Sequence, residues 1–229
     1  MSALVAYCAI ALGFVPLASD TRIHNYLVAH PKLVYEMQAL SDQQDAEDTD
    51  RAQQAVIKKF GLKHFLDPAV AYVTGPANAK NTLIEFYDYN CGHCRNTAGV
   101  VKAYYDKHKA DTRFAFIEFP IFGNASVMAA QASAAARLQG DKFLTFHFHL
   151  MDTGAEDSSS VFGAAQAASL NEQKLTADMS SPSLEKGLLA GYRLAREMKF
   201  NGTPVFIVNG KVHNGEISEA EIRELMKKG

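Results

Sequence analysis

The stretch Thr-Leu-Ile-Glu-Phe-Tyr-Asp-Tyr-Asn-Cys-Gly-His-Cys-Arg, residues 82–95, decides the fold. Its first part, 82–89, is rich in β-branched and aromatic residues and almost continuously apolar, which is typical of a strand buried on both faces. From Ala98 to Tyr105 the apolar residues recur at helical spacing, so Cys91 is expected to open a helix. The two cysteines of this stretch therefore lie where a buried strand meets a helix.

The elements that follow are predicted in the same way. They are a buried strand at 113–119, several helices between 124 and 200, a strand at 205–208, a short return strand and a final helix at 218–228. Asn209-Gly210, directly after the strand at 205–208, is the dipeptide preferred in type I′ hairpin turns. A strand-helix-strand unit with a closing hairpin and helix predicts a two-layer α/β domain with a helical insertion at about 124–200.

Composition excludes several classes of protein. The chain has 229 residues, of which 48% are apolar and 21% charged, so it is not a disordered, collagen-like or disulfide-stapled chain. With 23 Lys and Arg against 25 Asp and Glu, the net charge is -2. No basic field attracts a phosphate backbone, so we expect no nucleic-acid partner.

The N-terminus reads as a secretory leader. Residues 1–19 carry no charge, and an apolar run from Leu4 to Leu17 reaches the small residues Ala18-Ser19. A signal peptide is therefore expected at 1–19, although the usual Lys or Arg before the run is missing. An uncleaved anchor and a buried N-terminal helix remain alternatives. Cys8 lies inside this run and would be lost on processing.

The sequence pattern of residues 20–64 predicts a helical arm. An apolar stripe starts at Ile23 and Leu27 and continues beyond Pro31, which should separate a short helix from a longer one. The stretch 41–54 is dense in Asp, Glu and Gln and is not expected to pack deeply into a core. A stripe left outside the core predicts a homo-oligomer, a dimer or trimer, with folding back onto its own domain as the alternative. A loop at 67–76 follows.

The pair Cys91 and Cys94 suits thiol-disulfide exchange. A cysteine at a helix N-terminus has its thiolate favoured by the helix dipole, and His93 and Arg95 would add positive charge. Cys94, one helical turn further on, could resolve a mixed disulfide. A zinc site recruiting His147 and His149, and a purely structural disulfide, are the alternatives. We expect no metal and no cofactor.

Three segments carry a family resemblance. Residues 85–95, Gly202-Thr203-Pro204-Val205-Phe206 and 118–123 resemble the DsbA-like branch of the thioredoxin superfamily, and this likeness covers about residues 65–229. The arm, with 30–34 and Gln43-Gln44, resembles the suppressor-of-copper-sensitivity C (ScsC) members. The resemblance implies a thioredoxin fold with a helical insertion at about 124–200, on an N-terminal helical extension.

The resemblance also implies roles for single residues. Thr203 and Pro204 match a cis-proline loop that lies beside the cysteines and binds substrate, and Gly92 is assigned to the same substrate-binding surface. Glu85 matches a buried carboxylate that moves a proton to or from Cys94, whereas the pattern alone also allows a solvent-facing strand edge. His93 and the two cysteines complete the expected catalytic set. Cys91 is expected to be the exposed thiol and Cys94 the sheltered one.

The function implied is that of a periplasmic thiol-disulfide oxidoreductase. It would form or isomerise disulfides in secreted proteins, so its partners would be unfolded or misoxidised polypeptides and a membrane redox protein of the DsbB or DsbD kind. The dipeptide Gly92-His93 and the threonine before Pro204 resemble isomerases more than strong oxidases, but neither fixes the direction of electron flow. A copper(I)-binding protein that uses the same thiolates is the alternative from another class. A structural envelope protein held by the arm is a third.

Overall fold

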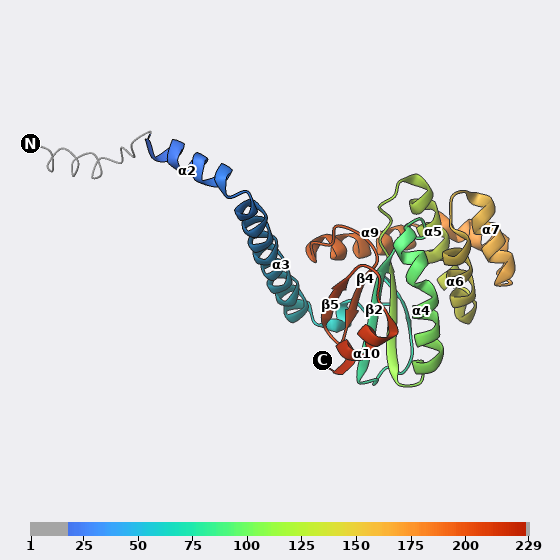
Figure 1. The fold of residues 1–229 in the computed structure, drawn as a ribbon. Helices are drawn as coiled ribbons and strands as arrows, with labels where there is room; N and C mark the ends of the chain where they lie inside the picture. The colour runs from blue at the N-terminus through green and yellow to red at the C-terminus, as the bar shows by residue number, and fades with distance from the viewer. Residues whose placement is uncertain (1–17, 228–229) are drawn as a thin grey trace, which may run out of the picture. The chain divides into compact units, whose positions relative to one another are not determined.

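The computed structural model describes residues 18–227, so the predicted leader and Cys8 lie outside the described residues except for the last positions of the leader. The helices are α2 (Ala18–Ala29), α3 (Lys32–Phe60), α4 (Gly92–His108), α5 (Asn124–Arg137), α6 (Phe143–Thr153), α7 (Ser158–Ala167), α8 (Glu172–Met179), α9 (Pro182–Glu197) and α10 (Glu219–Lys227). The strands are β1 (Tyr72–Thr74), β2 (Asn81–Tyr87), β3 (Thr112–Glu118), β4 (Val205–Val208) and β5 (Lys211–Asn214) (Figure 1). Between residues 18 and 227 no helix is both long enough and apolar enough to cross a membrane.

The described residues fall into two compact units, divided between residues 49 and 50. Within the first, α2 and the start of α3 are separated at His30 and Pro31, as predicted from the proline. The second unit begins inside α3. There Gln53 is buried and its Nε2 donates to the carbonyl oxygen of Met198 at 3.1 Å. The expectation that the polar stretch 41–54 stays out of the core is wrong at this residue, because a main-chain acceptor satisfies the buried amide.

The second unit is built on a five-stranded mixed sheet in the order β1-β3-β2-β4-β5. The strands β2 and β3 are parallel and are joined through α4, whereas the other neighbours pair antiparallel. Asn209 and Gly210 both have positive φ, 48° and 83°, which is the geometry of the type I′ turn predicted between β4 and β5. The predicted α/β architecture is confirmed.

The edge strand β1 was not predicted. Residues 67–76 were expected to form a loop because of their two X-Pro turns, yet Tyr72–Thr74 pair antiparallel with β3. Three residues are too few to show the alternation that identifies a strand. The pairing with β3 supplies the backbone partners that decide their conformation.

Side chains of the central strands alternate between two apolar layers. On β2, Leu83 and Tyr87 belong to the layer formed with α4, α10 and the helices α5 to α8. Ile84 and Phe86 belong to the opposite layer, which includes the end of α9. Because side chains of a strand alternate with period two, Glu85 projects to the same face as Leu83 and Tyr87. The predicted strand is buried on both faces, and an acid lies on its α4 face.

The helix α9 approaches the loop before β1 closely. A Cβ atom at Gly187 would lie 2.1 Å from the carbonyl oxygen of Ala69. At Gly191, one turn on, a Cβ would lie 3.1 Å from Cγ2 of Ile117. The two glycines give α9 a flat face toward the sheet, which closes the layer opposite α4.

Candidate active site

Cys91 is the N-cap residue of α4, in extended backbone conformation. The turn that delivers it is organised by Asp88, whose Oδ1 accepts from the amide of Asn90 at 2.9 Å and whose carbonyl oxygen accepts from the amide of Cys91 at 3.1 Å. The carbonyl oxygen of Cys91 then receives the amide of Arg95 at 3.1 Å, which begins the helix. The predicted position of the first cysteine at a helix N-terminus is confirmed.

The two cysteines are free thiols, and both are buried. The relative exposure of Cys91 is 2% and that of Cys94 is 0%. The expected exposure of Cys91 is therefore wrong. Its Sγ donates to the carbonyl oxygen of Thr203 at 3.1 Å, so the loop before β4 covers the sulfur.

That loop contains the cis peptide bond expected from the resemblance, between Thr203 and Pro204. Both residues are buried, and β4 begins immediately after them. Because β4 pairs antiparallel with β2, its start lies beside the end of β2, where the cysteine turn begins. Sheet pairing thus brings together two segments that are separated by 112 positions between Cys91 and Thr203.

Glu85 is a buried acid next to the second cysteine. Its side chain is on the α4 face of β2 and is 2% exposed, which excludes the solvent-facing alternative. Burial raises the pKa of its carboxyl to about 8. Burial and the charge of Glu85 also raise the pKa of Cys94, so Cys94 stays a thiol at neutral pH.

His93 and Gly92 lie on the outer surface of the first helical turn. The His93 side chain is 72% exposed, and its Nδ1 is 2.7 Å from Oε1 of Glu216. Gly92 is exposed, and a Cβ there would meet no atom within 4 Å. The sequence did not indicate Glu216, because only the fold brings the loop after β5 to α4.

Two further side chains of the cysteine turn bind loops of the helical insertion. Asp88 accepts the amides of Ile121 and Phe122 with Oδ2, at 2.7 and 3.2 Å. Asn90 exchanges two hydrogen bonds with the main chain of Ala155, at 3.0 and 3.1 Å. Neither role was expected from the sequence, although polar side chains just after an apolar strand are typical of residues that bind backbone.

Arg95 does not turn toward Cys91. Its guanidinium donates to the carbonyl oxygens of Met151 and Asp152, at 3.2 and 3.3 Å. These carbonyls end α6, where a cation is favoured by the helix dipole. The positive charge of Arg95, which was expected beside Cys91, therefore binds the end of α6 instead.

His147, weighed above as a zinc ligand, is buried in a polar cluster. Its Nδ1 is 3.0 Å from the hydroxyl of Tyr89, which donates to Ser133 at 2.9 Å. Ser133 in turn donates to Glu118 at 2.8 Å. Burial lowers the pKa of His147 to about 3, so its ring is neutral. Within residues 18–227, no group of three or more His, Cys, Asp or Glu side chains is arranged to hold a metal ion.

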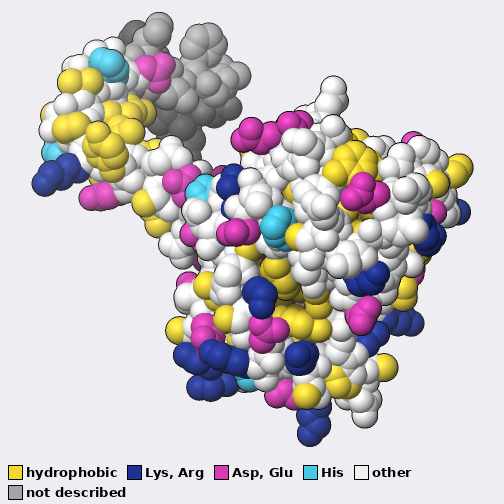
Figure 2. All heavy atoms as spheres, turned by 90° about the vertical axis from the view of Figure 1, so that its right-hand side faces the viewer, with side chains coloured by type: hydrophobic (Ala, Val, Ile, Leu, Met, Phe, Trp, Pro, Cys, Tyr) yellow, Lys and Arg dark blue, Asp and Glu magenta, His cyan; other side chains and the backbone are white. Residues whose placement is uncertain are grey.

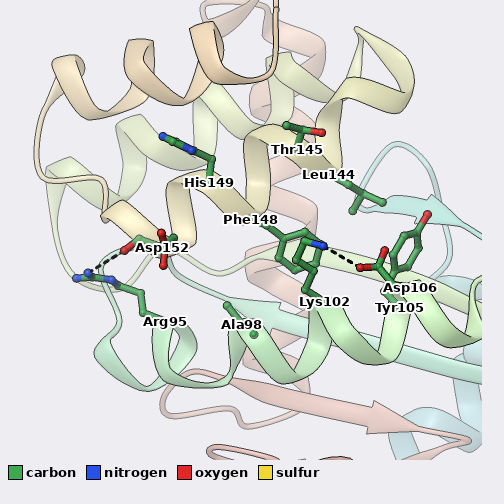
Figure 3. A pocket seen from close by; sticks show the side chains of 11 residues that line it. Arg95, Ala98, Lys102, Tyr105, Asp106, Leu144, Thr145, Phe148, His149 and Asp152 are labelled. Carbon is green, nitrogen blue, oxygen red and sulfur yellow. Dashed lines mark hydrogen bonds and ion pairs between the residues drawn. The ribbon is translucent and has the colours of Figure 1, made fainter.

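A pocket of about 480 Å³ opens between α4 and α6 (Figure 3). Phe148 lies in its middle, Arg95 and Asp152 at one end, and the ion pair of Lys102 and Asp106 at the other. Figure 2, which faces the side of the helical insertion, shows apolar side chains at the bottom of a hollow with acidic and basic side chains around it. The pocket extends along α4 from the residue that follows Cys94.

A dithiol at the start of a helix, covered by a cis-proline loop and placed over a mixed five-stranded sheet, defines a protein of the thioredoxin fold with a DsbA-like helical insertion. The match to a family model supports this class. The chain belongs to the thioredoxin family, whose model, described as "Thioredoxin", matches residues 69–228.

Solved structures share the fold. A thioredoxin-like oxidoreductase from Silicibacter pomeroyi DSS-3 is 32% identical, with a TM-score of 0.67 over 73% of this chain and 96% of that one. A linker-deletion variant of ScsC from Proteus mirabilis is 22% identical, with a TM-score of 0.70 over 94% of this chain and 98% of that one. The second likeness concerns the fold alone.

The sequence is also similar to two kinds of curated proteins. Disulfide bond formation protein D of Bacillus subtilis is 27% identical over 169 residues, which are 68% of this chain and 75% of that protein. The first curated relatives are Na⁺/H⁺ antiporters of the NhaA type, and the one from Herminiimonas arsenicoxydans is 24% identical over 162 residues. The match takes in 71% of this chain but only 26% of that antiporter.

Proposed function

We propose that this protein is a thiol-disulfide oxidoreductase in which Cys91 and Cys94 form the redox pair. The observation that carries the proposal is the arrangement of four groups: the sulfur of Cys91 lies at a helix N-terminus and against the Thr203 carbonyl, and Cys94 lies one turn deeper beside Glu85. A thiolate is favoured at the first position, and a resolving thiol is held at the second. Each of these groups has a role in thiol-disulfide exchange.

In the forward direction the Cys91–Cys94 disulfide accepts two electrons. A substrate thiolate attacks the sulfur of Cys91, a mixed disulfide forms, and Cys94 leaves and takes up a proton. The buried carboxyl of Glu85, which is protonated below about pH 8, is the donor beside it. A second substrate thiolate then attacks the substrate sulfur of the mixed disulfide. The bond to Cys91 breaks, Cys91 leaves as a thiolate, and the substrate leaves with a disulfide.

In the reverse direction Cys94 resolves a mixed disulfide. Its thiol attacks the sulfur of Cys91, its proton passes to ionised Glu85, and the substrate leaves as a thiol after taking up a proton. The raised pKa of Cys94 makes this proton transfer the step that needs help. Glu85 therefore acts as acid in one direction and as base in the other.

The substrates we propose are unfolded or misoxidised secreted polypeptides, bound across Gly92 and the Thr203-Pro204 loop. The carbonyl oxygen of Thr203 lies at the sulfur, where an extended substrate could pair with the main chain of the loop. The name of the Bacillus subtilis relative, a disulfide bond formation protein, supports disulfide formation. The Gly92-His93 dipeptide favours isomerisation as a further activity. A membrane redox protein of the DsbB or DsbD kind would return the pair to its working state.

A periplasmic location is part of the proposal. Disulfides persist in oxidising compartments, where an enzyme that makes or rearranges them has its substrates. The apolar N-terminal stretch 1–19 reads as the leader that would take the chain there. Secretion of the full chain with loss of this stretch, followed by N-terminal sequencing of the mature protein, tests the location.

The residues of the arm support self-association. In the described part of residues 20–49, large apolar side chains are more than half exposed: Ile23, Tyr26, Val28, Val34, Tyr35, Met37 and Leu40. Isolated helices of this length gain little stability in water, whereas burial of such a stripe between copies stabilises them. We therefore propose a homo-oligomer, a dimer or trimer, joined through 20–49.

Replacement of the cysteines tests the activity. Cys91→Ser is expected to abolish the reduction of insulin by dithiothreitol and the refolding of scrambled ribonuclease. Cys94→Ser should instead trap a mixed disulfide between Cys91 and its substrate, visible by mass spectrometry. Retention of both activities by Cys91→Ser would reject the proposal. Circular dichroism of both variants controls for folding.

A further inference from the structure

Glu216 lies outside the Cys-Gly-His-Cys segment. Its carboxylate nevertheless contacts two side chains in the first turns of α4. Its Oε1 atom is 2.7 Å from Nδ1 of His93 and accepts a hydrogen bond from Nδ2 of Asn96 at 2.9 Å. His93 and Asn96 belong to α4, whereas Glu216 comes from the loop between β5 and α10. A carboxylate is therefore placed on one of the two residues that separate the cysteines.

The loop that carries Glu216 is fixed on both sides of the residue. The amide of Gly215 donates to the carbonyl oxygen of Pro204 at 2.9 Å. On the other side, Thr97 donates to the carbonyl oxygen of Ile217 at 3.1 Å. The loop thus joins the cis-proline loop to α4, and its geometry aims the carboxylate of Glu216 at His93.

The charged groups around this pair have other partners. Arg95 binds the carbonyls that end α6, and Lys107 binds Glu219 at 3.1 Å near the far end of α4. His213 contacts Glu216 only at the main-chain oxygen, at 2.8 Å. The hydrogen bonds from Asn96 and His93 lower the pKa of Glu216, so it is ionised at neutral pH. The side chains of α4 that Glu216 contacts are thus His93 and Asn96.

We propose that Glu216 is a positioning residue that holds the imidazole of His93 and so limits how strongly His93 stabilises the Cys91 thiolate. The inference rests on the proposed exchange activity. With glutathione, the Cys91–Cys94 bond breaks and the glutathione disulfide forms, so two electrons pass to the protein while two glutathione thiols lose their protons. A cation beside Cys91 favours the dithiol side of this equilibrium, and a carboxylate bound to that cation opposes it.

The test is the equilibrium constant of the full-length protein with glutathione. E216Q removes the carboxylate and leaves the His93 side chain in place. We expect E216Q to shift the equilibrium toward the dithiol by about twofold to fivefold, the range of an exposed ion pair.

A second pair of variants separates positioning from a general effect of charge. In an H93Q background the shift caused by E216Q should vanish, because the cation through which Glu216 acts is gone. E219Q is the matched control. Glu219 is the first residue of α10, shortly after Glu216, and it binds Lys107 in the last turn of α4. E219Q should leave the constant unchanged.

Three results would overturn the inference: no shift with E216Q, an equal shift in the H93Q background, or an equal shift with E219Q. A parent protein that never reaches a redox equilibrium with glutathione would instead reject the proposed function. The two failures are therefore distinguishable in one set of titrations. The measurement is a redox equilibrium constant. Loss of a merely structural contact would not make the effect of E216Q depend on the presence of His93.

Discussion

At the scale of a single residue, the burial of Glu85 affects both the stability of the protein and the chemistry that we propose. An acid inside an apolar strand is visible in the sequence, but its position beside Cys94 follows from the pairing of β2 and from α4 packed over it. Burial of a carboxyl without a cation partner favours its protonated form. The group that we propose as proton carrier must therefore destabilise the folded dithiol protein wherever it is ionised.

The first prediction concerns pH and Glu85. The unfolded carboxyl loses its proton near pH 4.5 and the folded one near pH 8, so the folded state binds more protons between these values. The free energy of unfolding should then be fully retained below pH 4.5 and fall as pH rises to 8. The loss is up to about 5 kcal/mol, at 1.36 kcal/mol for each pH unit. Urea denaturation of reduced protein measures it.

Glu85→Gln is the matched variant for that measurement. It keeps the shape and removes the ionisation, so its unfolding free energy should vary less between pH 5 and 8 than that of the parent. The variant should be the more stable protein at pH 8. Parallel pH profiles of the two proteins would contradict the assignment of the raised pKa to Glu85.

A second prediction concerns the two sulfurs. Cys94 has no exposed surface, and burial together with Glu85 raises its pKa, so it stays a poorly reactive thiol. Iodoacetamide at neutral pH should therefore label Cys91 first, as peptide mass spectrometry can follow. Denatured protein, in which both thiols react alike, is the control. Preferential labelling of Cys94 would reverse the roles that we give to the two residues.

At the scale of elements, α4 and α9 use glycine differently. A Cβ at Gly187 in α9 would lie 2.1 Å from the main-chain oxygen of Ala69, whereas a Cβ at Gly99 in α4 would meet nothing within 4 Å. Helix propensity favours alanine over glycine at both positions by about 0.5–1 kcal/mol. Only at Gly187 does close packing against backbone oppose that preference.

The third prediction uses this pair of glycines. Gly187→Ala should lower the free energy of unfolding by about 1–3 kcal/mol, the usual cost of overpacking. Gly99→Ala should raise it by about 0.5–1 kcal/mol. Chemical denaturation of both variants measures the difference. Equal effects at the two positions would mean that α9 does not approach Ala69 as described.

The sequence predicted correctly those helices and strands whose own residues show a recognisable hydrophobic or turn pattern. The strands β2 and β3, the helix α4 and the β4–β5 hairpin follow from apolar runs, helical spacing and Asn209-Gly210. The edge strand β1 escaped because its conformation depends on pairing with β3. The contacts of Glu216 and Asn90 escaped for the same reason: their partners lie 120 and 65 positions away in the chain, at Asn96 and Ala155.

For the whole molecule, the exposed stripe of the arm gives a fourth prediction. The protein without residues 1–19 should be a dimer or trimer by light scattering, and Ile23→Asp with Val34→Asp should make it a monomer, because charges would replace apolar contacts. Leu138→Asp is the control, since Leu138 is 52% exposed on the second unit. A parent protein that stays monomeric at tens of micromolar would end the oligomer proposal.

The position of β4 has a consequence for synthesis on the ribosome. The strand lies in the interior of the sheet, between β2 and β5, yet it is translated after β1, β2 and β3. The carbonyl of Thr203 that covers Cys91 arrives with it. Until then the nascent chain carries two unsheltered cysteines and an open edge on β2, both of which can react with or pair to other chains. We therefore expect the nascent chain to depend on chaperones until β4 has paired with β2.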